Sequence, residues 1–353
     1  MADALSGTAP TLSDRRWVRR LAGLARTLGS VAVTILGLLA LTFFIGRMLP
    51  LDPVLAVLGD DASQAAYDRM YRQLGLDQPL HVQFYQYVRD ALSFDFGRSL
   101  SSGRPVMDDI RRVFPATVEL ATVSMLLGTA IGVPLGVIAA ARRDTWVDQV
   151  IRVVALIGYS APNFWLGLIG LTVFYASLGW VGAPGRIDVV HQFDVETWSG
   201  LLLIDTARVG NWDAFRDVVS RLVLPSSILA YGALAYIARM TRSFMLEQLN
   251  QEYIIAARAK GASRAAVIWG HAFPNIAVQL VTVIALSYAF LLEGAVLTET
   301  VFAWPGFGRY LTTALLRSDM NAVLGCVLII GLIFISLNLL ADLFYRSFDP
   351  RTR

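Results

Sequence analysis

The chain has 353 residues, of which 56% are hydrophobic and only 16% are charged. An average soluble domain carries about 25% charged residues, so this composition argues against a soluble globular protein and points to a lipid bilayer. The formal net charge of +3 is accounted for by arginines beside the predicted membrane spans, and no nucleic-acid partner is expected.

Six apolar runs are long enough to cross the hydrocarbon core of a membrane, which takes about 20 residues of helix. The fourth run is the shortest and opens close to Pro225. No small-residue cleavage site follows the first run, which predicts an uncleaved span rather than an export signal. The pattern predicts an all-α integral membrane protein with six transmembrane helices, at residues 30–49, 116–141, 153–180, 222–237, 273–297 and 322–343.

Arginines crowd the residues before the first span, at Arg15, Arg16, Arg19, Arg20 and Arg26. Short cytoplasmic segments hold an excess of Lys and Arg, so the N-terminus is predicted to be cytoplasmic and, after six crossings, so is the C-terminus. The expected order is a cytoplasmic tail, the first span, an extracytoplasmic helical segment, a transmembrane domain and a second cytoplasmic tail, at residues 1–29, 30–49, 50–115, 116–345 and 346–353.

The extracytoplasmic segment 50–115 carries helix-start signals. Asp60 or Asp61 is expected to cap a helix that runs to Arg72, and Asp77 precedes Pro79 in an N-cap arrangement. The segment is expected either to help receive an external protein or to cover the spans as a packing cap.

The residues that soluble enzymes use are sparse in this chain. The single cysteine, Cys326, lies inside the last span, and the histidines are far apart, so neither a metal site nor a catalytic site is expected. A P-loop needs a lysine followed by Ser or Thr, but the only lysine, Lys260, is followed by Gly261. Energy for uphill transport would therefore come from an ion gradient or from another protein.

Ion-coupled transporters place ionisable groups deep in their spans, and here Glu293 is the one candidate at useful depth. A structural or dimer-interface role is expected for Glu293, with a position along the transport pathway as the alternative. Because the middles of the spans carry so few charges, a transporter driven by a separate protein is favoured over an ion-gradient-coupled secondary transporter.

The cytoplasmic loop at residues 246–272 is the most unusual segment. Leu249, Tyr253, Ala256 and Ala257 follow a helical period and predict one small apolar face. Gly261 is expected to end this helix. Ser263 is a candidate N-cap for a second short helix that runs to residue 269.

The same loop resembles the EAA loop of permease subunits in binding-protein-dependent ABC importers, through Ala256, Ala257 and Gly261 followed by Phe273 and Pro274. It departs at Ile255, where many of these loops have Glu. The oligopeptide/dipeptide/nickel branch is similar over nearly the whole chain, through LGLDQPLHVQFYQY, DFGRSL, FPATVELA, GVPLGVIAA, APNFWLGL, TETVFAWPGFGRY and DLFYRSFDPRTR.

The resemblance implies a type I ABC importer permease fold in a bacterial or archaeal inner membrane. It implies a second homologous permease as partner, two cytoplasmic ATPases that bind ATP and Mg²⁺, and an extracytoplasmic solute-binding protein. No cofactor is expected in the chain itself. The branch carries peptides, nickel, opines and some oligosaccharides, of which a peptide cargo is the expectation.

The resemblance also assigns roles within the loop and beyond it. The loop would be a coupling helix for an ATPase, with Ala256, Ala257 and Gly261 in contact and with Glu252, Arg258 and Lys260 as orienting charges. On the other side of the membrane, a turn follows the fifth span and is expected either to anchor at the interface or to act as an outer gate or binding-protein contact, through Trp304, Pro305 and Gly306.

Overall fold

The structure is a computed structural model that describes residues 12–48, 53–59, 63–73 and 75–348. Within these ranges it is built of helices joined by turns, and the only β pairing is an isolated bridge between Arg98 and Pro105. The first part of the chain forms α1 (Leu12–Met48), α2 (Pro53–Leu58), α3 (Gln64–Gln73), α4 (Leu80–Leu92), α5 (Val106–Ala141), α6 (Trp146–Ser160), α7 (Asn163–Gly170) and the π-helix η1 (Leu171–Ser177). The second part forms α8 (Val189–Gln192), α9 (Leu202–Val209), α10 (Trp212–Leu249), α11 (Glu252–Ala259), the π-helix η2 (Ala266–Ala272), α12 (Phe273–Val301), α13 (Phe307–Leu316) and α14 (Met320–Phe348).

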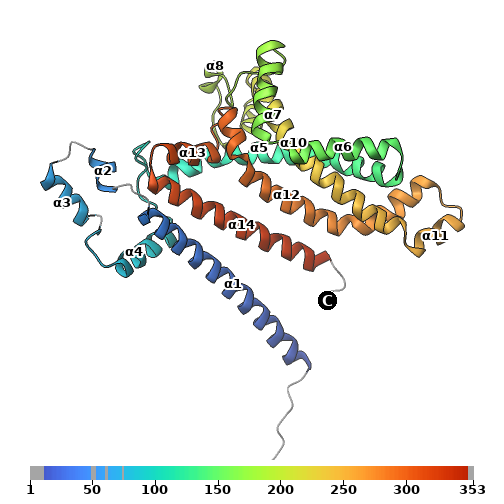
Figure 1. The fold of residues 1–353 in the computed structure, drawn as a ribbon, viewed down its shortest axis with the longest axis horizontal. Helices are drawn as coiled ribbons and strands as arrows, with labels where there is room; N and C mark the ends of the chain where they lie inside the picture. The colour runs from blue at the N-terminus through green and yellow to red at the C-terminus, as the bar shows by residue number, and fades with distance from the viewer. Residues whose placement is uncertain (1–11, 49–52, 60–62, 74, 349–353) are drawn as a thin grey trace, which may run out of the picture.

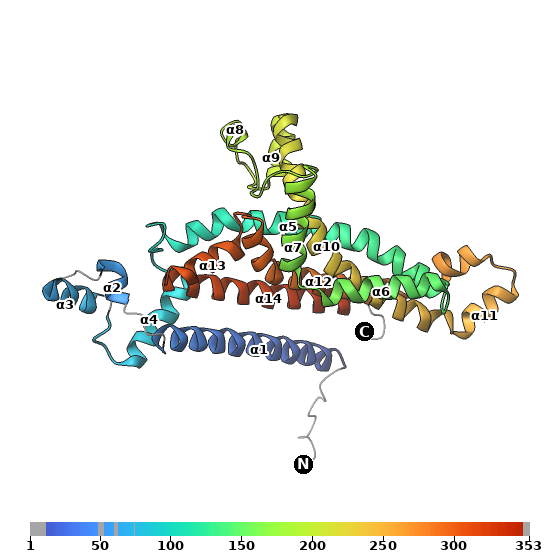
Figure 2. The ribbon, with the colours of Figure 1, turned by 45° about the horizontal axis from the view of Figure 1, so that its top comes forward.

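The molecule is elongated along its long helices. Helices α2 to α4 lie at one end and α11 lies at the other, as expected for segments on opposite sides of a membrane (Figure 1). Helix α1 runs beside α14 on the outside of the bundle (Figure 2). The segment around α7, α8 and α9 stands out from the side of the long axis in both views.

Five helices in the described ranges are long and apolar enough to cross a membrane, at Ala25–Gly46, Val106–Ala141, Trp212–Leu249, Ala266–Leu292 and Met320–Leu340. A sixth crossing exists only if the pair formed by α6 and the segment Asn163–Ser177 counts as one span, and this pair is bent by 98°. The all-helical class and five to six spans agree with the sequence prediction.

The prediction of one continuous third span at residues 153–180 is wrong. Ala161 has an extended backbone and precedes Pro162, and a residue before proline is disfavoured in the helical conformation. The helix therefore ends at Ser160 and the chain turns sharply before α7 starts.

Helices also extend beyond the apolar runs that predicted them. Helix α1 already begins at Leu12, so much of the predicted tail 1–29 is helical, while residues 1–11 lie outside the described ranges. Helix α10 covers Trp212–Leu249 rather than 222–237 and keeps Pro225 inside it. Helix α14 continues to Phe348, which places the start of the predicted tail 346–353 in the helix.

Of the caps predicted for the outer segment, one lies outside the described residues and the other is wrong. Asp60 and Asp61 lie outside the described residues, and the Oγ atom of Ser63 accepts a hydrogen bond of 3.4 Å from the N–H of Ala66 at the start of α3. The prediction for Asp77 is wrong, because α4 starts after Pro79 without a side-chain cap.

The centre of the bundle is the contact between α5 and α10. Gly128, Gly132 and Gly136 form a stripe with one glycine per helical turn, and a Cβ on each would lie 3.1, 3.1 and 2.6 Å from backbone atoms of α10. The partners advance in the same order, from Ala230 to Ala238, so the helices run parallel. Small residues let membrane helices approach this closely.

The tightest of these contacts gives a stability prediction. Gly136→Ala is expected to cost about 1–3 kcal/mol, because the new methyl would overlap Ala238 and Thr241 in a packed core. Gly37→Ala in α1 is the matched control, since nothing lies within 4 Å of its Cβ position. Thermal unfolding in detergent should show a lower transition temperature for the first variant only, and equal transitions would contradict the close α5–α10 contact.

Candidate functional site

The loop between α10 and α12 is fixed to the bundle by one apolar side chain. Ile254 in α11 is fully buried and packs in a cluster with Val137, Met245 and Val267. The predicted apolar face is wrong in part, because Tyr253 and Ala256 are exposed and only Leu249 and Ala257 pack against the cluster. The cluster joins the ends of α5 and α10 to α11 and η2, so α11 sits on the ends of both long helices.

The predicted bend at Gly261 and the predicted cap at Ser263 are both confirmed. Gly261 has a φ of +84°, in the left-handed region that glycine enters without strain. The Oγ atom of Ser263 accepts a hydrogen bond of 3.2 Å from the N–H of Ala266. The helix that follows is a π-helix, η2, and it leads directly into α12. A turn with a left-handed glycine thus separates α11 from the start of the next span.

The outer surface of α11 and the residue that follows it carry exposed charges. Glu252, Arg258 and Lys260 are exposed, and none of them forms an ion pair in the part of the chain that the structure describes. Ala256 and Gly261 are also exposed, whereas Ala257 is half-buried. The structure therefore brings the predicted contact residues onto one short segment at the tip of the molecule, with Ala257 partly turned inward.

Ile255 stands out on the same surface. Its side chain is 63% exposed although it is apolar. Single exposed apolar residues are common on protein surfaces. Ile255 lies between the exposed charges of α11, and burying its side chain against a partner would not require removing water from a polar group.

Hydrogen bonds connect the loop to three long helices. The hydroxyl of Tyr253 lies 2.8 Å from Gln248 Oε1 in α10 and accepts a bond of 3.0 Å from Asn275 Nδ2 in α12. Arg264 donates to the backbone oxygen of Ala141, the last residue of α5. These hydrogen bonds link the loop to the ends of α5, α10 and α12.

On the opposite side of the bundle, Trp304 is not a surface residue. It is fully buried, and its indole N–H donates a hydrogen bond of 2.9 Å to the backbone oxygen of Ala116 in α5. The prediction that its side chain anchors at an interface or contacts a binding protein is therefore wrong. Pro305 is exposed and Gly306 is buried, so a gating role for this turn stays a prediction.

Gly306 lies directly against Glu299. The Glu299 carboxyl is fully buried and accepts hydrogen bonds from the hydroxyl of Thr117 and from the N–H of Arg309, at 2.5 and 3.0 Å. A Cβ at Gly306 would overlap this carboxyl group. The Glu299 carboxyl thus packs against the turn between α12 and α13, and only glycine at position 306 leaves space for it.

A substitution tests this packing. Gly306→Ala is expected to destabilise the protein by about 1–3 kcal/mol, because the Glu299 carboxyl would have to leave its hydrogen bonds. Gly294→Ala in α12, the helix that carries Glu299, serves as the control, because nothing lies within 4 Å of the Cβ position of Gly294. Thermal unfolding of both variants measures the difference, and a Gly306→Ala variant as stable as the control would contradict the closed turn.

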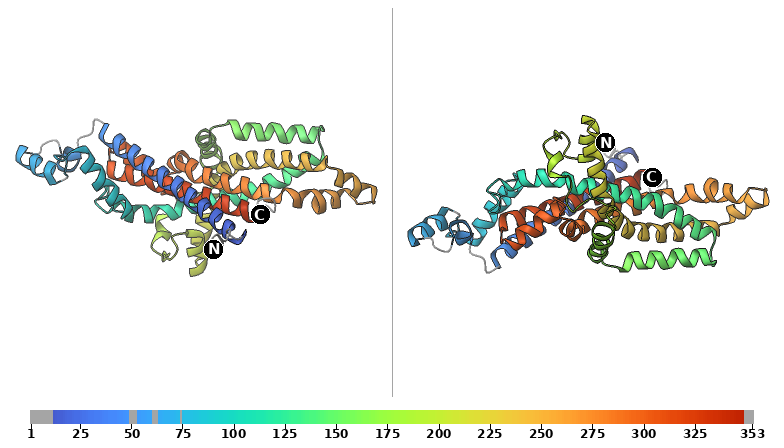
Figure 3. Two further views of the ribbon diagram at one scale, coloured as in Figure 1. Left: turned by 90° about the horizontal axis from the view of Figure 1, so that it is seen from below. Right: turned by 90° about the horizontal axis from the view of Figure 1, so that it is seen from above.

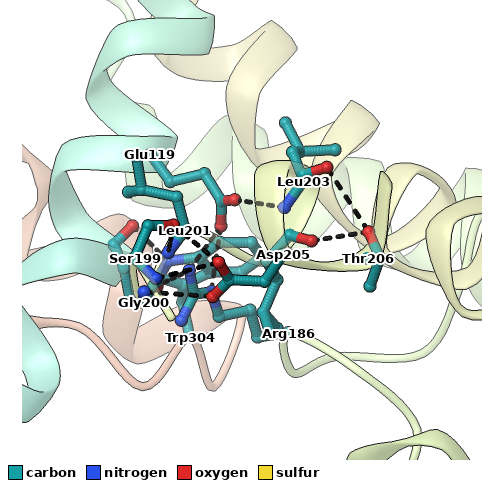
Figure 4. A network of polar contacts seen from close by, with 11 residues as sticks. Glu119, Arg186, Ser199, Gly200, Leu201, Leu203, Asp205, Thr206 and Trp304 are labelled. Carbon is teal, nitrogen blue, oxygen red and sulfur yellow. Dashed lines mark hydrogen bonds and ion pairs between the residues drawn. The ribbon is translucent and has the colours of Figure 1, made fainter. Parts of the chain in front are cut away.

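A buried polar network that the sequence did not predict lies beside this turn (Figure 4). Arg186 donates two hydrogen bonds of 2.7 and 2.9 Å to the Glu119 carboxylate and one of 2.6 Å to the Gly200 backbone oxygen. The second carboxylate oxygen of Glu119 accepts from the N–H of Leu203, at 2.7 Å. The side chains of Glu119 and Arg186 are only 3% and 11% exposed, and the guanidinium lies 5.9 Å from the ring of Trp304. The network fastens the 186–205 segment onto α5.

A second ion-pair group holds the same segment to α10. Arg221 donates to the carboxylates of Asp188 and Asp217, each at 2.8 Å, and to the backbone oxygen of Ala183. The backbone N–H of Val190 and the Arg221 guanidinium together hold the pKa of Asp188 below its usual range. The segment that stands out from the bundle is therefore held to both α5 and α10.

Glu293 lies in α12, but its side chain is outside what the structure describes. Its role in the dimer interface or the pathway stays a prediction.

Two family models match this sequence. The model described as "Binding-protein-dependent transport system inner membrane component" matches residues 132–353, and that family's N-terminal model matches residues 20–121. The chain belongs to this family of inner membrane components.

Curated relatives agree over nearly the full length. The chain is 41% identical to "Probable D,D-dipeptide transport system permease protein DdpB" of Escherichia coli K12, over 91% of the chain and 94% of the relative. It is 42% identical to "Dipeptide transport system permease protein DppB" of the same strain, over 93% of the chain and 97% of the relative. It is 40% identical to "Di/tripeptide transport system permease protein DppB" of Pseudomonas aeruginosa, over 94% of the chain and 98% of the relative. These relatives identify the chain as a transmembrane permease subunit of an ABC importer.

Proposed function

We propose that this permease takes up dipeptides or similar short peptides into a bacterial or archaeal cell, driven by separate ATPases that dock on the α11 loop. The observation that carries the coupling part is the tip of the molecule. There, exposed charges at Glu252, Arg258 and Lys260, which form no ion pair with the other described residues, surround the small residues Ala256 and Gly261. Charges of this kind orient a partner, and small side chains permit its close approach.

The lone lysine supports the assignment of ATP hydrolysis to partners. Lys260 is followed by Gly261, and a P-loop needs Ser or Thr there to hold the Mg²⁺ that accompanies ATP. ATP and Mg²⁺ are thus bound by two cytoplasmic ATPase subunits, and this chain carries no cofactor. Both termini and the α11 loop face the cytoplasm in this proposal.

The mechanical part of the proposal rests on the contacts of the loop. Ile254 packs on the ends of α5 and α10, and Tyr253 and Arg264 are hydrogen-bonded to all three neighbouring helices. When the ATPases close on ATP, a push on α11 would move these helices as a unit between inward-facing and outward-facing states. A second, homologous permease completes the pathway, and an extracytoplasmic binding protein supplies the peptide.

An ion-gradient-coupled transporter is the competing function. It would need ionisable groups along the pathway, and Glu293 is the only candidate that the sequence offers at depth. The two functions differ in one requirement, namely the ATPase subunits.

Reconstitution separates them. The permease, its operon partners and a binding protein loaded with a labelled dipeptide would be placed in liposomes, with ATP inside. We expect uptake that requires both the ATPases and ATP and that is insensitive to collapse of the proton gradient. Uptake without the ATPases, driven by an imposed proton gradient, would overturn the proposal.

A further inference from the structure

Helices α6 and α10 enclose an open groove with a volume of about 510 Å³ near the α11 end of the molecule. Helix α6 lies at the edge of the bundle beside α10, and its far side faces away from the rest of the chain (Figure 3). The walls of the groove are mostly apolar, through Ile151, Ala155, Leu156, Ala235, Ala238 and Leu246.

Three arginines line the same groove, at Arg152, Arg239 and Arg242. Arg242 is neutralised by Asp148, to which it donates two hydrogen bonds of 2.7 Å. Arg152 lies 3.7 Å from the same carboxylate, so Asp148 is shared between Arg152 and Arg242. The Asp148 side chain is fully buried. Asp148 thus offsets the charge of only one of the three guanidinium groups that line the groove, which leaves a surplus of positive charge there.

Arg239 has no carboxylate partner among the residues that the structure describes. Its guanidinium carbon lies 5.0 Å from the ring centre of Tyr159 and 5.5 Å from that of Tyr236. Contact between the flat face of a guanidinium and an aromatic ring leaves the N–H groups at its edge free to donate. The side chain is exposed, and within the described residues it lies against the two rings without a hydrogen bond from its donors.

We infer that this groove binds an anionic phospholipid, with the phosphate at Arg239 and Arg152 and one acyl chain along the apolar walls. A free phosphate or nucleotide would use the charge but not the long apolar surface, and a zwitterionic lipid would use the apolar surface but gain little from the charge. Basic pockets between membrane helices on the cytoplasmic side are suited to acidic lipid headgroups. This inference does not depend on the coupling role of the α11 loop.

Lipid binding by the full-length chain is the test, with native mass spectrometry as the readout. Dioleoylphosphatidylglycerol should bind more tightly than dioleoylphosphatidylcholine. Arg239→Ala should lower the affinity for phosphatidylglycerol by about fivefold, the factor that corresponds to about 1 kcal/mol per basic residue. Inorganic phosphate at millimolar concentration should not displace the lipid.

Two further variants keep the test specific. Arg143 follows the C-terminal end of α5, is paired with Asp144 and does not line the groove. Arg143→Ala should therefore leave the affinity unchanged. Ala155→Phe fills the apolar wall and retains all three arginines, and it should also weaken binding. Circular dichroism of each variant verifies that it is folded.

Several results would overturn the inference. Equal affinities for the two lipids, equal effects of Arg239→Ala and Arg143→Ala, or an Ala155→Phe variant with unchanged binding would each do so. Displacement by inorganic phosphate would assign the arginines to a free anion instead, and loss of binding only when two copies of the chain associate would assign the groove to a protein interface.

Discussion

Replacing Glu119 with leucine is expected to destabilise this permease by roughly 3–5 kcal/mol, the range for removing one partner of a buried ion pair. The cost arises because Arg186, only 11% exposed, would keep its charge in a buried site without the carboxylate that accepts two of its hydrogen bonds. The N–H of Leu203 would lose its acceptor as well. Thermal unfolding in detergent would measure the loss.

Two comparisons make this prediction specific. Asp213→Leu breaks a pair with Arg216 in which both side chains are more than 80% exposed, and surface pairs of this kind contribute at most about 1 kcal/mol. The double variant Glu119→Leu with Arg186→Met should recover most of the lost stability, because no unpaired buried charge remains. A Glu119→Leu variant no less stable than Asp213→Leu would contradict the buried network.

Replacing Gly261 with valine is expected to reduce ATP-driven uptake between about 5-fold and 150-fold, the range of coupling free energies between distant sites. Gly261 has a φ of +84°, and a β-branched residue there would cost about 1–2 kcal/mol or force the turn to change. A changed turn would misplace α11 relative to η2 and the start of α12. Uptake by reconstituted vesicles and ATP hydrolysis, measured together, would report the loss of coupling.

Gly210→Val is the matched control for this substitution. Gly210 also has a positive φ, +74°, at the end of a short helix, and nothing lies within 4 Å of the Cβ position at either glycine. The two variants therefore carry the same local strain at opposite parts of the bundle. Equal losses of uptake would show that strain, rather than the position of α11, is responsible.

Hydropathy predicted most of the fold because spans must be apolar over about 20 residues, and the runs at 116–141, 273–297 and 322–343 lie within α5, α12 and α14. Hydropathy could not give the helix ends, because α10 continues as polar helical turns on both sides of the apolar run 222–237, from Trp212 to Leu249. The third span failed for a different reason. An apolar window adds α6 and α7 together, and only the local conformation before Pro162 separates them.

Within the loop, local features were predictable and tertiary ones were not. The bend at Gly261 and the cap at Ser263 depend on neighbouring residues, which the sequence displays. The buried residue of α11 is decided by its contact with α5 and α10, and so Ile254 rather than Tyr253 faces the bundle. A helical period finds a face, but it does not say which face meets a neighbour.

The outer network illustrates the same limit over a longer distance. Glu119 and Arg186 are 67 residues apart, and each alone resembles an ordinary charge near the end of a span. Only the folded chain brings them together and buries Trp304 beside them. A sequence signal existed in the excess of aspartates and arginines between residues 181 and 221, but it does not assign the pairs.

Site-specific photocross-linking from Ala256 is the most direct test of whether an ATPase docks on the α11 loop. A photoreactive amino acid would replace exposed Ala256 in α11, or exposed Ala207 in α9 as the control, in the complex reconstituted with its ATPases. A permease–ATPase adduct is expected from position 256, with a yield that changes when ATP is added, and none is expected from position 207. An assembled complex that hydrolyses ATP and takes up dipeptide, yet gives no adduct from position 256, would contradict the docking of an ATPase on the α11 loop.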